Sequence, residues 1–393
     1  MSGLPLSGIT VVALEHAVAA PFCSRQLADL GARVIKVERP GVGDFARGYD
    51  ERVRGLASHF VWTNRSKESL TLDLKQPAAR GILMRLVRER AEVLVQNLAP
   101  GAASRLGLSY AALSVAAPSL VVCDISGYGD DGPYRDKKAY DLLIQGESGL
   151  LSITGTEEES AKAGISIADI AAGMYAYSGI LAALFERTRT GRGKHVEISM
   201  LEALVEWMGY PLYYAFEGAD PPPRAGASHA TIYPYGPFPA GDGKVVMLGL
   251  QNEREWAAFC AQVLRRPDLA RDDRFANNSK RSAARAELRA IIAEAFSALT
   301  AEEVVARLDA AQIANARVNT MREVWEHPQL RARKRWRDVA TPAGSIPAPL
   351  LPGLGDEARM GGIPALGAHT DAILRELGYS ADRIAALRAA EAI

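Results

Sequence analysis

The first 125 residues alternate strand-like apolar runs with helix-like segments, and this alternation constrains the fold more than any other feature. Strands are predicted over residues 9–14, 33–38, 69–74, 92–96 and 119–124, and helices over 21–30 and 77–89. Strands separated by helices pair in parallel through right-handed crossovers. We therefore expect an α/β domain with an open, Rossmann-like parallel sheet and helices on both of its faces.

The chain has 393 residues, which is too long for one compact core and predicts at least two domains. Its composition shifts at the proline-rich segment 220–226, which we interpret as the end of a linker. We expect a large α/β domain over 1–200, a linker over 201–226 and a smaller α+β domain over 227–329. Residues 330–393 are expected to return to the large domain.

Composition excludes several classes of function. Lys plus Arg equals Asp plus Glu at 46 each, so bulk charge gives no support for nucleic-acid binding. The three cysteines are far apart without a C-x-x-C pair, and the histidines lack metal-ligand spacing, so no metal site is predicted. We find no signal peptide and no continuous apolar run of about 18 residues, and we expect a cytoplasmic protein without a membrane span.

Common nucleotide and hydrolase motifs are also missing. No G-x-G-x-x-G follows the first predicted strand, and no G-x-x-x-x-G-K-[ST] occurs in the chain. A nicotinamide, flavin or ATP cofactor therefore has little support. A serine hydrolase lacks its G-x-S-x-G signature as well.

Asp169 stands between a short run of small residues and a long apolar helix predicted over about 170–186. An aspartate in this position can be a helix N-cap, because its carboxylate accepts hydrogen bonds from free backbone N–H groups. It can equally be a nucleophile held at the positive end of a helix. The local sequence leaves both interpretations open.

Polar and basic residues follow the predicted strands at the edge where parallel sheets bind ligands. They are Arg39, Lys75, Asn97 and Arg105. Each one alone is explained by an ordinary solvated surface. Four that converge would form a cationic rim suited to a phosphorylated ligand.

Residues 32–44, which read ARVIKVERPGVGD, resemble the opening motif of CoA-transferase family III, the group of the formyl-CoA and carnitine CoA-transferases. Further family motifs follow in order, and together they cover nearly the whole chain. They are Asn64–Lys67, Leu70–Lys75, Asn97–Gly101, Arg105–Gly107, Ser126–Gly129, Gly132–Pro133, Tyr140–Gly149, Gly164–Gly173, Thr190–Lys194 and His369–Asp371.

The resemblance implies that Asp169 is the acyl-accepting nucleophile. A carboxylate with an ordinary pKa of about 3.9 is ionised at neutral pH and needs no general base. Attack on an acyl-CoA donor would give a mixed anhydride and then an aspartyl-CoA thioester, which a carboxylic acid acceptor would resolve. Coenzyme A and acyl-CoA are then substrates, and no permanently bound cofactor, ATP or metal is required.

The resemblance also implies which residues contact coenzyme A and how the chain assembles. The implied coenzyme A contacts are Arg39, Leu72, Lys75, Asn97, Leu98, Arg105 and Lys138. Asp141 matches an acidic position near the reaction centre, although it is equally explained as a helix N-terminal charge. An interlocked homodimer is the assembly that the family implies.

Two departures from the family pattern bear on specificity. Tyr140 stands where the racemase branch has a histidine, and a tyrosine with an ordinary pKa of about 10 is a poor base at neutral pH. The glycine-rich lid of formyl-CoA transferases is absent, and residues 228–236 take its place, which disfavours oxalate and formate. An acyl-CoA racemase and a non-catalytic acyl-CoA binder remain as the less favoured alternatives.

Segments 14–21, 44–49 and 251–256 resemble members that act on four- and five-carbon dicarboxylates. We expect a succinyl-CoA donor with itaconate, mesaconate, citramalate or malate as acceptor. Transfer of coenzyme A between the two carboxyls of mesaconate is the alternative. The distal carboxylate of such an acid requires a cation, and Arg47, Arg65 and His229 are the candidates.

Overall fold

The computed structural model describes residues 3–393, which form two compact units. The first unit contains the residues up to 148, 163–209 and 329–393, and the second contains 149–162 and 210–328. The predicted boundaries placed residues 149–162 in the large domain and 201–209 in the linker. The structure groups the former segment with the second unit and the latter with the first.

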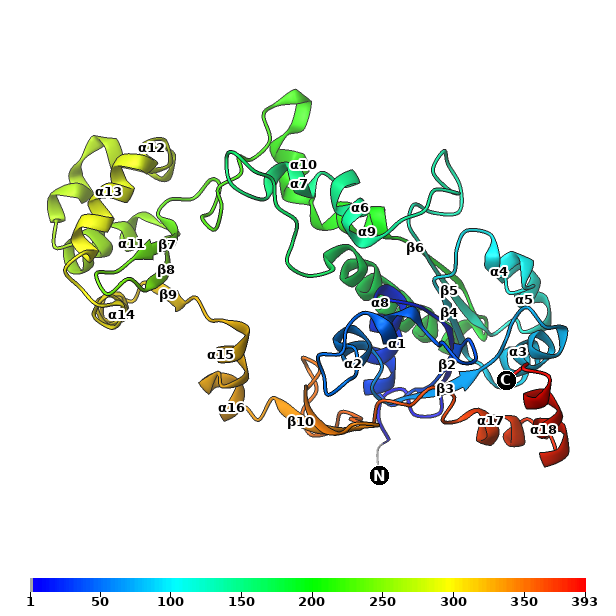
Figure 1. The fold of residues 1–393 in the computed structure, drawn as a ribbon. Helices are drawn as coiled ribbons and strands as arrows, with labels where there is room; N and C mark the ends of the chain where they lie inside the picture. The colour runs from blue at the N-terminus through cyan, green and yellow to red at the C-terminus, as the bar shows by residue number, and fades with distance from the viewer. Residues whose placement is uncertain (1–2) are drawn as a thin grey trace. The chain divides into compact units, whose positions relative to one another are not determined.

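The first unit is built on six parallel strands in the order β3-β2-β1-β4-β5-β6, which confirms the expected open parallel sheet (Figure 1). The strands are β1 (Thr10–Leu14), β2 (Arg33–Glu38), β3 (Lys67–Thr71), β4 (Val93–Gln96), β5 (Val121–Ser126) and β6 (His195–Ser199). The chain moves outward from β1 to β3 and then returns to pair β4 with the other side of β1. Ligands of such sheets bind beyond the carboxyl ends of the strands at this reversal.

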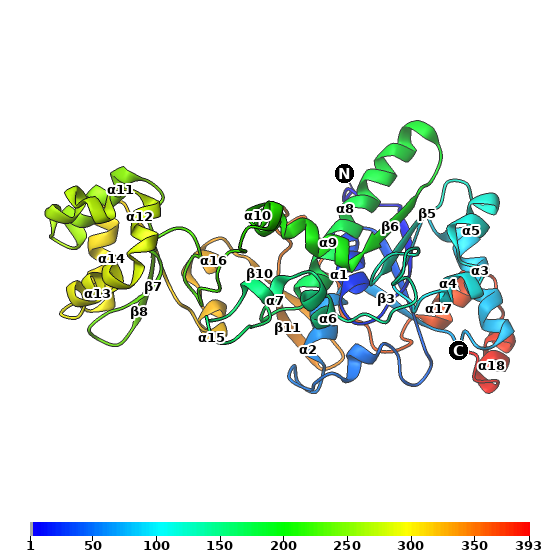
Figure 2. The same cartoon turned by 90° about the horizontal axis from the view of Figure 1, so that it is seen from above.

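Helices cover both faces of this sheet, as Figures 1 and 2 show. The helices of the first unit are α1 (Ala19–Asp29), η1 (Phe45–Gly48), α2 (Ser58–Thr63), α3 (Pro77–Arg90), α4 (Ala102–Arg105), α5 (Tyr110–Ala116), α6 (Asp141–Glu147), α8 (Ile167–Thr190), α9 (Met200–Trp207), α16 (Pro328–Ala332), α17 (Thr370–Glu376) and α18 (Ala381–Ala389). A separate hairpin pairs β10 (Trp336–Thr341) with β11 (Gly344–Pro349).

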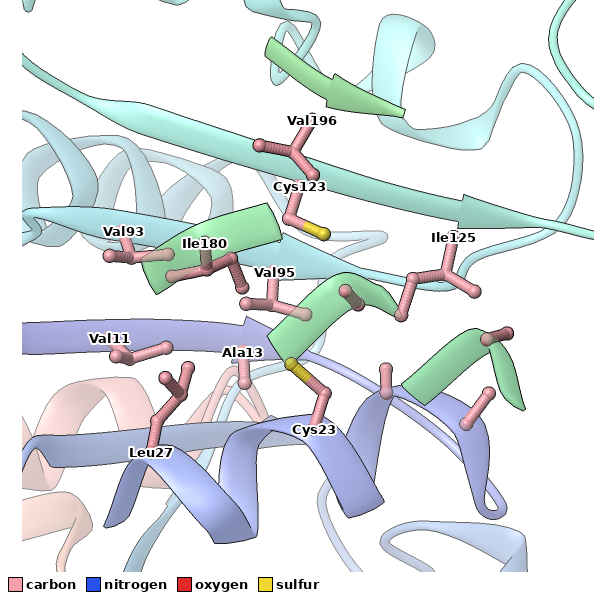
Figure 3. Close-up of a cluster of buried hydrophobic side chains, with 14 of the residues drawn as sticks. Val11, Ala13, Cys23, Leu27, Val93, Val95, Cys123, Ile125, Ile180 and Val196 are labelled. Carbon is pink, nitrogen blue, oxygen red and sulfur yellow. The ribbon is translucent and has the colours of Figure 1, made fainter. Parts of the chain in front are cut away.

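Alternate residues of each strand enter opposite cores because successive side chains point to opposite faces of a sheet. Val11 and Ala13 pack with α1 and α8 on one face, where Cys23 and Ile180 lie (Figure 3). Residues of the opposite parity pack on the other face with α3, α5, α17 and α18. The sheet is therefore buried on both faces, as parallel sheets require.

Within residues 3–393, α8 is the one helix whose length and apolar composition match a membrane span. Its buried residues include Ala168, Ala172, Ala176 and Ile180, which belong to the core that it shares with α1 and the sheet. This packing accounts for its apolar character.

The carboxyl-terminal segment covers the outer edge of β3. The backbone N–H of Ser69 donates to His369 Nδ1 at 3.1 Å, and Ser69 C=O accepts from His369 N–H at 3.0 Å. The N–H of Thr71 donates to Thr370 Oγ1 at 3.0 Å. An edge strand with unpaired backbone groups is an aggregation hazard, and this segment satisfies those groups.

The second unit is a small α+β domain, as predicted. Its sheet pairs β7 (Tyr235–Pro239), β8 (Val245–Gly249) and β9 (Ala314–Arg317) in antiparallel fashion. Its helices are α7 (Leu150–Ile153), α10 (Gly209–Tyr214), η2 (Phe216–Gly218), α11 (Glu253–Ala258), η3 (Phe259–Val263), η4 (Pro267–Arg271), η5 (Asp273–Phe275), α12 (Asn278–Ala283), α13 (Arg285–Phe296), α14 (Ala301–Ala310) and α15 (Met321–Trp325). Trp256, Phe259 and Phe296 are buried in its core.

Candidate active site

Asp169 lies in the first turn of α8, because the helix begins at Ile167, three residues before the predicted start. Ser166 occupies the N-cap position, and its side chain makes no capping hydrogen bond. The interpretation of Asp169 as the N-cap of this helix is therefore wrong. Its carboxylate lies at the amino-terminal end of α8 without capping it.

Asp141 caps α8 in its place. Its Oδ1 atom accepts hydrogen bonds from the backbone N–H groups of Ala168 at 2.8 Å and of Asp169 at 3.3 Å. These are two of the N–H groups that a helix cannot satisfy within its own first turn. Asp141 also begins α6, so it is the helix N-terminal charge that the sequence allowed and a neighbour of Asp169 as well.

The environment of Asp169 disfavours its ionised form. Burial of its carboxylate and the nearby charge of Asp141 raise the pKa of Asp169 to about 7. The side chain keeps some exposed surface. Burial, together with the charges of Asp44 and Asp169 and the neighbouring Tyr140, also raises the pKa of the Tyr49 phenol to about 12. The Tyr49 phenol therefore lies near the Asp169 carboxylate, and Tyr140 lies near Tyr49.

His16 and Asn97 meet where the strand order reverses, immediately beyond the carboxyl ends of β1 and β4. Asn97 Oδ1 accepts from the His16 N–H at 2.9 Å, and Asn97 Nδ2 donates to the His16 C=O at 2.9 Å. The His16 ring stacks on Phe45 with centroids 5.2 Å apart. The Asn97 amide thus positions the main chain at this edge, whereas the family resemblance implied only a coenzyme A contact.

A buried ion cluster of Glu15, Lys36, Asp44 and Lys67 lies next to the carboxyl end of β1 and joins it to β2 and β3. Lys36 Nζ lies 2.8 Å from Asp44 Oδ2 and 3.3 Å from Glu15 Oε1, and Lys67 Nζ lies 2.6 Å from Glu15 Oε1. Burial and the Lys36 charge lower the pKa of Lys67 to about 8, although Glu15 opposes that change. Two acids and two lysines balance one another, which makes their burial tolerable.

Asp44 connects the ion cluster to the strained turn that precedes α1. Its Oδ1 atom accepts from the Ala17 N–H at 3.1 Å and from the Ala46 N–H at 2.9 Å. Ala17 has φ of +60°, in the left-handed region that residues other than glycine seldom adopt. The cluster therefore holds in place the turn that contains His16.

Four of the predicted coenzyme A contacts are exposed cations that follow strands of the parallel sheet or adjoin its neighbouring helices. Arg39 directly follows β2, Lys75 follows β3, Arg105 ends α4, and Lys138 precedes α6; all four are exposed. Within residues 3–393, no carboxylate forms an ion pair with any of these four side chains. Such unpaired cations remain suited to the phosphates of a ligand.

The two predicted leucine contacts differ from one another. Leu72 is 2% exposed and its side chain packs in the core, so the predicted coenzyme A contact stays a prediction for its main chain only. Leu98 is half-buried, and its N–H donates to Gln96 Oε1 at 2.7 Å. Gln96 in turn donates to Asp124, which is paired with His195 at 2.7 Å. This chain of contacts fixes the start of the loop after β4.

The two arginines that were candidates for a distal carboxylate are already paired. Arg65 is 2% exposed, and its guanidinium donates to both oxygens of Asp29 at 2.8 and 2.6 Å. Arg47 donates to both oxygens of Glu38 at 2.8 Å and covers the ring of Phe60. The structure contradicts the expectation that either arginine is a free cation for substrate.

His229, the third candidate, belongs to the second unit. Its Nδ1 atom accepts from the N–H groups of Thr231 at 3.2 Å and Ile232 at 3.1 Å, and its ring stacks on Tyr235. These contacts give it a structural role in a turn of that unit. Its predicted substrate contact stays a prediction.

Sequence reasoning missed Gln145, which the structure places beside the candidate nucleophile. It is fully buried on α6, and it contacts both Asp141 and the segment before α8. Its spacing of four residues from Asp141 was the available signal, because residues four apart on a helix face the same side. Within residues 3–393, no group of three or more His, Cys, Asp or Glu side chains is arranged to hold a metal ion.

Comparisons with known proteins agree with this geometry. The sequence profile of CoA-transferase family III matches residues 6–370. The chain is 34% identical to a succinate–glutarate CoA-transferase of Agrobacterium fabrum, over 95% of this chain and 96% of that protein. It is 33% identical to a succinyl-CoA–D-citramalate CoA-transferase of Chloroflexus aurantiacus, over 99% and 98%. A CAIB/BAIF family protein from Brucella suis superimposes with a TM-score of 0.83 at 33% identity, over 96% and 100%.

Proposed function

The chain belongs to CoA-transferase family III, and from this premise we propose that it moves coenzyme A from succinyl-CoA to a short dicarboxylic acid through Asp169. The relatives named for glutarate and D-citramalate support a dicarboxylate acceptor. Itaconate, mesaconate, citramalate, malate and glutarate are therefore the acids to test first.

One observation carries the role of Asp169: a largely buried carboxylate with some exposed surface, at a helix amino terminus, whose surroundings disfavour its charge. An ionised carboxylate with a raised pKa is a stronger nucleophile than an ordinary one, because basicity and nucleophilicity rise together. Acylation removes its negative charge and with it the repulsion from Asp141. The site therefore favours the acylated state over the free anion.

The reaction needs no external source of energy. An Asp169 oxygen attacks the thioester carbonyl of succinyl-CoA, the C–S bond breaks, and a mixed anhydride and coenzyme A thiolate form. The thiolate attacks the Asp169 carbonyl carbon and releases succinate, leaving an aspartyl-CoA thioester. The acceptor carboxylate then attacks this thioester, and the returning thiolate takes the acceptor acyl group and regenerates the Asp169 carboxylate. Coenzyme A is exchanged between substrates, so the proposed reaction uses no resident cofactor.

The residues that flank Asp169 on α8 are small and buried, so this end of the helix is tightly packed. Ala168, Ala171, Ala172 and Gly173 surround it on α8. Gly173 also allows α8 to pack closely on α1, because a Cβ there would lie 2.7 Å from the Ala19 carbonyl oxygen. The position of the nucleophile is thus fixed by close packing between two helices.

We also propose a homodimer, as the family resemblance implies. The first unit leaves large apolar side chains exposed on α6, α8 and α9, among them Leu143, Phe185 and Trp207. These exposed apolar side chains support the proposal, because a partner subunit that covered them would remove apolar surface from water. Sedimentation equilibrium should give twice the chain mass, and a monomer at micromolar concentration would reject the proposal.

Trapping tests the nucleophile directly. The protein is incubated with succinyl-CoA and quenched with hydroxylamine, and the modified residue is located by mass spectrometry. A hydroxamate at Asp169 that disappears in D169N supports transfer, and a panel of the acids above then identifies the acceptor. Deuterium exchange at the acyl α-carbon without modification of Asp169 would instead indicate a racemase. If neither the adduct nor the exchange is observed, the protein is a non-catalytic acyl-CoA binder.

A further inference from the structure

We propose that Gln145 is a positioning residue that holds Asp141 as a permanent anion beside Asp169, so that Asp169 is the carboxyl group of the pair that takes up the proton. The inference rests on the proposed function of Asp169 and adds a cause for its reactivity. It assigns a task to a buried side chain that does not itself contact the reacting atoms.

The orientation of the Gln145 amide follows from its contacts. Its Oε1 atom accepts a hydrogen bond from the backbone N–H of Ala163 at 2.9 Å. A backbone N–H can only donate, so the oxygen of the amide must face Ala163. The NH₂ end then faces Asp141, and Nε2 donates to Asp141 Oδ2 at 2.7 Å. The amide has only one orientation that satisfies both neighbours.

Asp141 is consequently surrounded by donors. Its Oδ2 atom faces the Gln145 NH₂ group, and its Oδ1 atom faces the N–H groups of Ala168 and Asp169. A proton on either oxygen of Asp141 would point an O–H donor at an N–H donor, and the hydrogen bond that this oxygen accepts would be lost. Asp141 is therefore held as a carboxylate anion.

This arrangement reverses the usual effect of a helix amino terminus on Asp169. The free N–H groups of a helix ordinarily stabilise an anion in the first turn. Here the N–H groups at the start of α8 are bound by Asp141, and the negative charge that they stabilise is the charge of Asp141. A second anion at Asp169 is then repelled, so any proton shared by the two carboxyls goes to Asp169.

In the part of the chain that the structure describes, neither Asp141 nor Asp169 forms an ion pair. Tyr49 lies near Asp169, and Tyr140 lies near Tyr49. On the elements packed against α8, the charged groups are paired with one another or exposed. They are Arg25 with Asp29 on α1, Glu147 with Lys137 at α6, His195 with Asp124 on β6 and β5, Glu197 on β6, and Glu202 and Glu206 on α9.

The structure suggests a charge swap that keeps every hydrogen bond. In the double variant D141N/Q145E, the Asn oxygen can accept from Ala168 and Asp169, and the Asn NH₂ can donate to the new glutamate. The second oxygen of that glutamate can accept from Ala163. The negative charge then lies one hydrogen bond farther from Asp169, while the connections between α6 and α8 remain.

The test measures the rate of hydroxylamine-trapped adduct formation at Asp169 against pH. For each protein, the rate of adduct formation at about pH 5.5 is divided by its rate at about pH 8. This ratio should be about 5- to 10-fold higher in the double variant than in wild type, as a fall of one pH unit in the midpoint requires. Q145M, which removes both contacts of the amide, should also lower the midpoint. E186Q, which removes an acidic charge from the far end of α8, should leave the midpoint unchanged.

A second measurement does not depend on turnover. The stability difference between D169N and its parent depends on pH with a midpoint set by Asp169, and this midpoint should be lower in the double-variant background. Wild-type midpoints in both D141N/Q145E and Q145M would overturn the role of Gln145 and leave the proposed function intact. Absence of an Asp169 adduct in wild type at every pH would overturn the proposed function, and the stability midpoint would still decide the role of Gln145.

Discussion

The side-chain amide of Asn97 binds both main-chain groups of His16, accepting from its N–H and donating to its C=O at 2.9 Å each. This contact joins β4 to β1 at the point where the strand order reverses. It makes the position of His16 dependent on a residue 81 positions away in the chain.

Replacing Asn97 should therefore affect activity more than stability. N97A removes the two hydrogen bonds and should cost about 1–2 kcal/mol of unfolding free energy. It should lower kcat/KM about tenfold or more, because a loosened His16 turn misplaces the groups at the sheet edge. S380A is a matched control, since it removes the N-cap of α18 at a cost of about 1 kcal/mol and should keep full turnover. Equal activity of the two variants would contradict this role of Asn97.

Asp169 should destabilise the folded protein at alkaline pH. Its pKa is about 7 when folded, against about 3.9 in an unfolded chain. Between these values the folded state binds more protons than the unfolded state, so stability falls as pH rises. D169N should exceed wild type by about 1–3 kcal/mol at about pH 8, and the difference should close toward about pH 4. Urea unfolding from about pH 4 to about pH 8 measures this difference, and D131N, at an exposed aspartate, is the control. A stability difference between D169N and wild type that does not change with pH would refute the prediction.

The buried ion cluster should tolerate paired changes better than single ones. K36M leaves Asp44 and Glu15 short of one cation and should cost about 3–5 kcal/mol. K36M/D44N removes one charge of each sign, keeps an acceptor for Ala17 and Ala46, and should recover part of that loss. The double-mutant cycle is measured by denaturant unfolding. An additive cycle would show that the two charges do not depend on each other.

Arg65 should influence stability and not acceptor affinity. R65K loses the two-pronged contact with the buried Asp29 and should cost about 2 kcal/mol. The KM for the acceptor acid should stay unchanged, because the side chain is enclosed. R33K, at a more exposed pair with Glu68, should cost less than about 1 kcal/mol. A raised acceptor KM in R65K at unchanged stability would restore the original expectation for Arg65.

Gly173 should be intolerant of even one methyl group. The new Cβ in G173A would meet the Ala19 carbonyl oxygen at 2.7 Å and the Phe22 ring at 3.0 Å. The resulting separation of α1 from α8 should cost about 1–3 kcal/mol despite the better helix propensity of alanine, and should reduce turnover. G81A on α3 has no atom within 4 Å of the new Cβ and should stabilise the protein by about 0.5–1 kcal/mol. Thermal unfolding of both variants compares the cost of the steric clash in G173A with the gain in helix propensity in G81A.

The parallel sheet was predictable because its strands are continuous apolar runs of suitable length between helices. Val93–Gln96 and Arg33–Glu38 are strands within one residue of their predicted bounds. The four-residue strand β9 was not predicted, since its Ala-Asn-Ala-Arg sequence has no apolar alternation and depends on pairing with β8. Local pattern therefore specifies the interior strands, and tertiary contact specifies the short edge strand.

The role of Asp169 stays a prediction, whereas the ion-pair partners of the predicted cations could not be predicted from the sequence. Arg65 pairs with Asp29, 36 residues away, and no local pattern indicates which carboxylate a distant arginine will find. The start of α8 was misplaced for a similar reason, because the cap that begins the helix comes from Asp141 on another helix. The family resemblance proposes Asp169 as the nucleophile, and the fold identifies the groups that influence its charge.

The contacts between β3 and residues 369 and 370 have a consequence for synthesis on the ribosome. Helix α8 and all six strands of the parallel sheet emerge long before the segment that covers the outer edge of β3. Until residues 369 and 370 are translated, the sheet presents an open strand to neighbouring chains on the polysome. A premature stop codon shortly before codon 369 should therefore yield inclusion bodies, even though the whole parallel sheet has been translated.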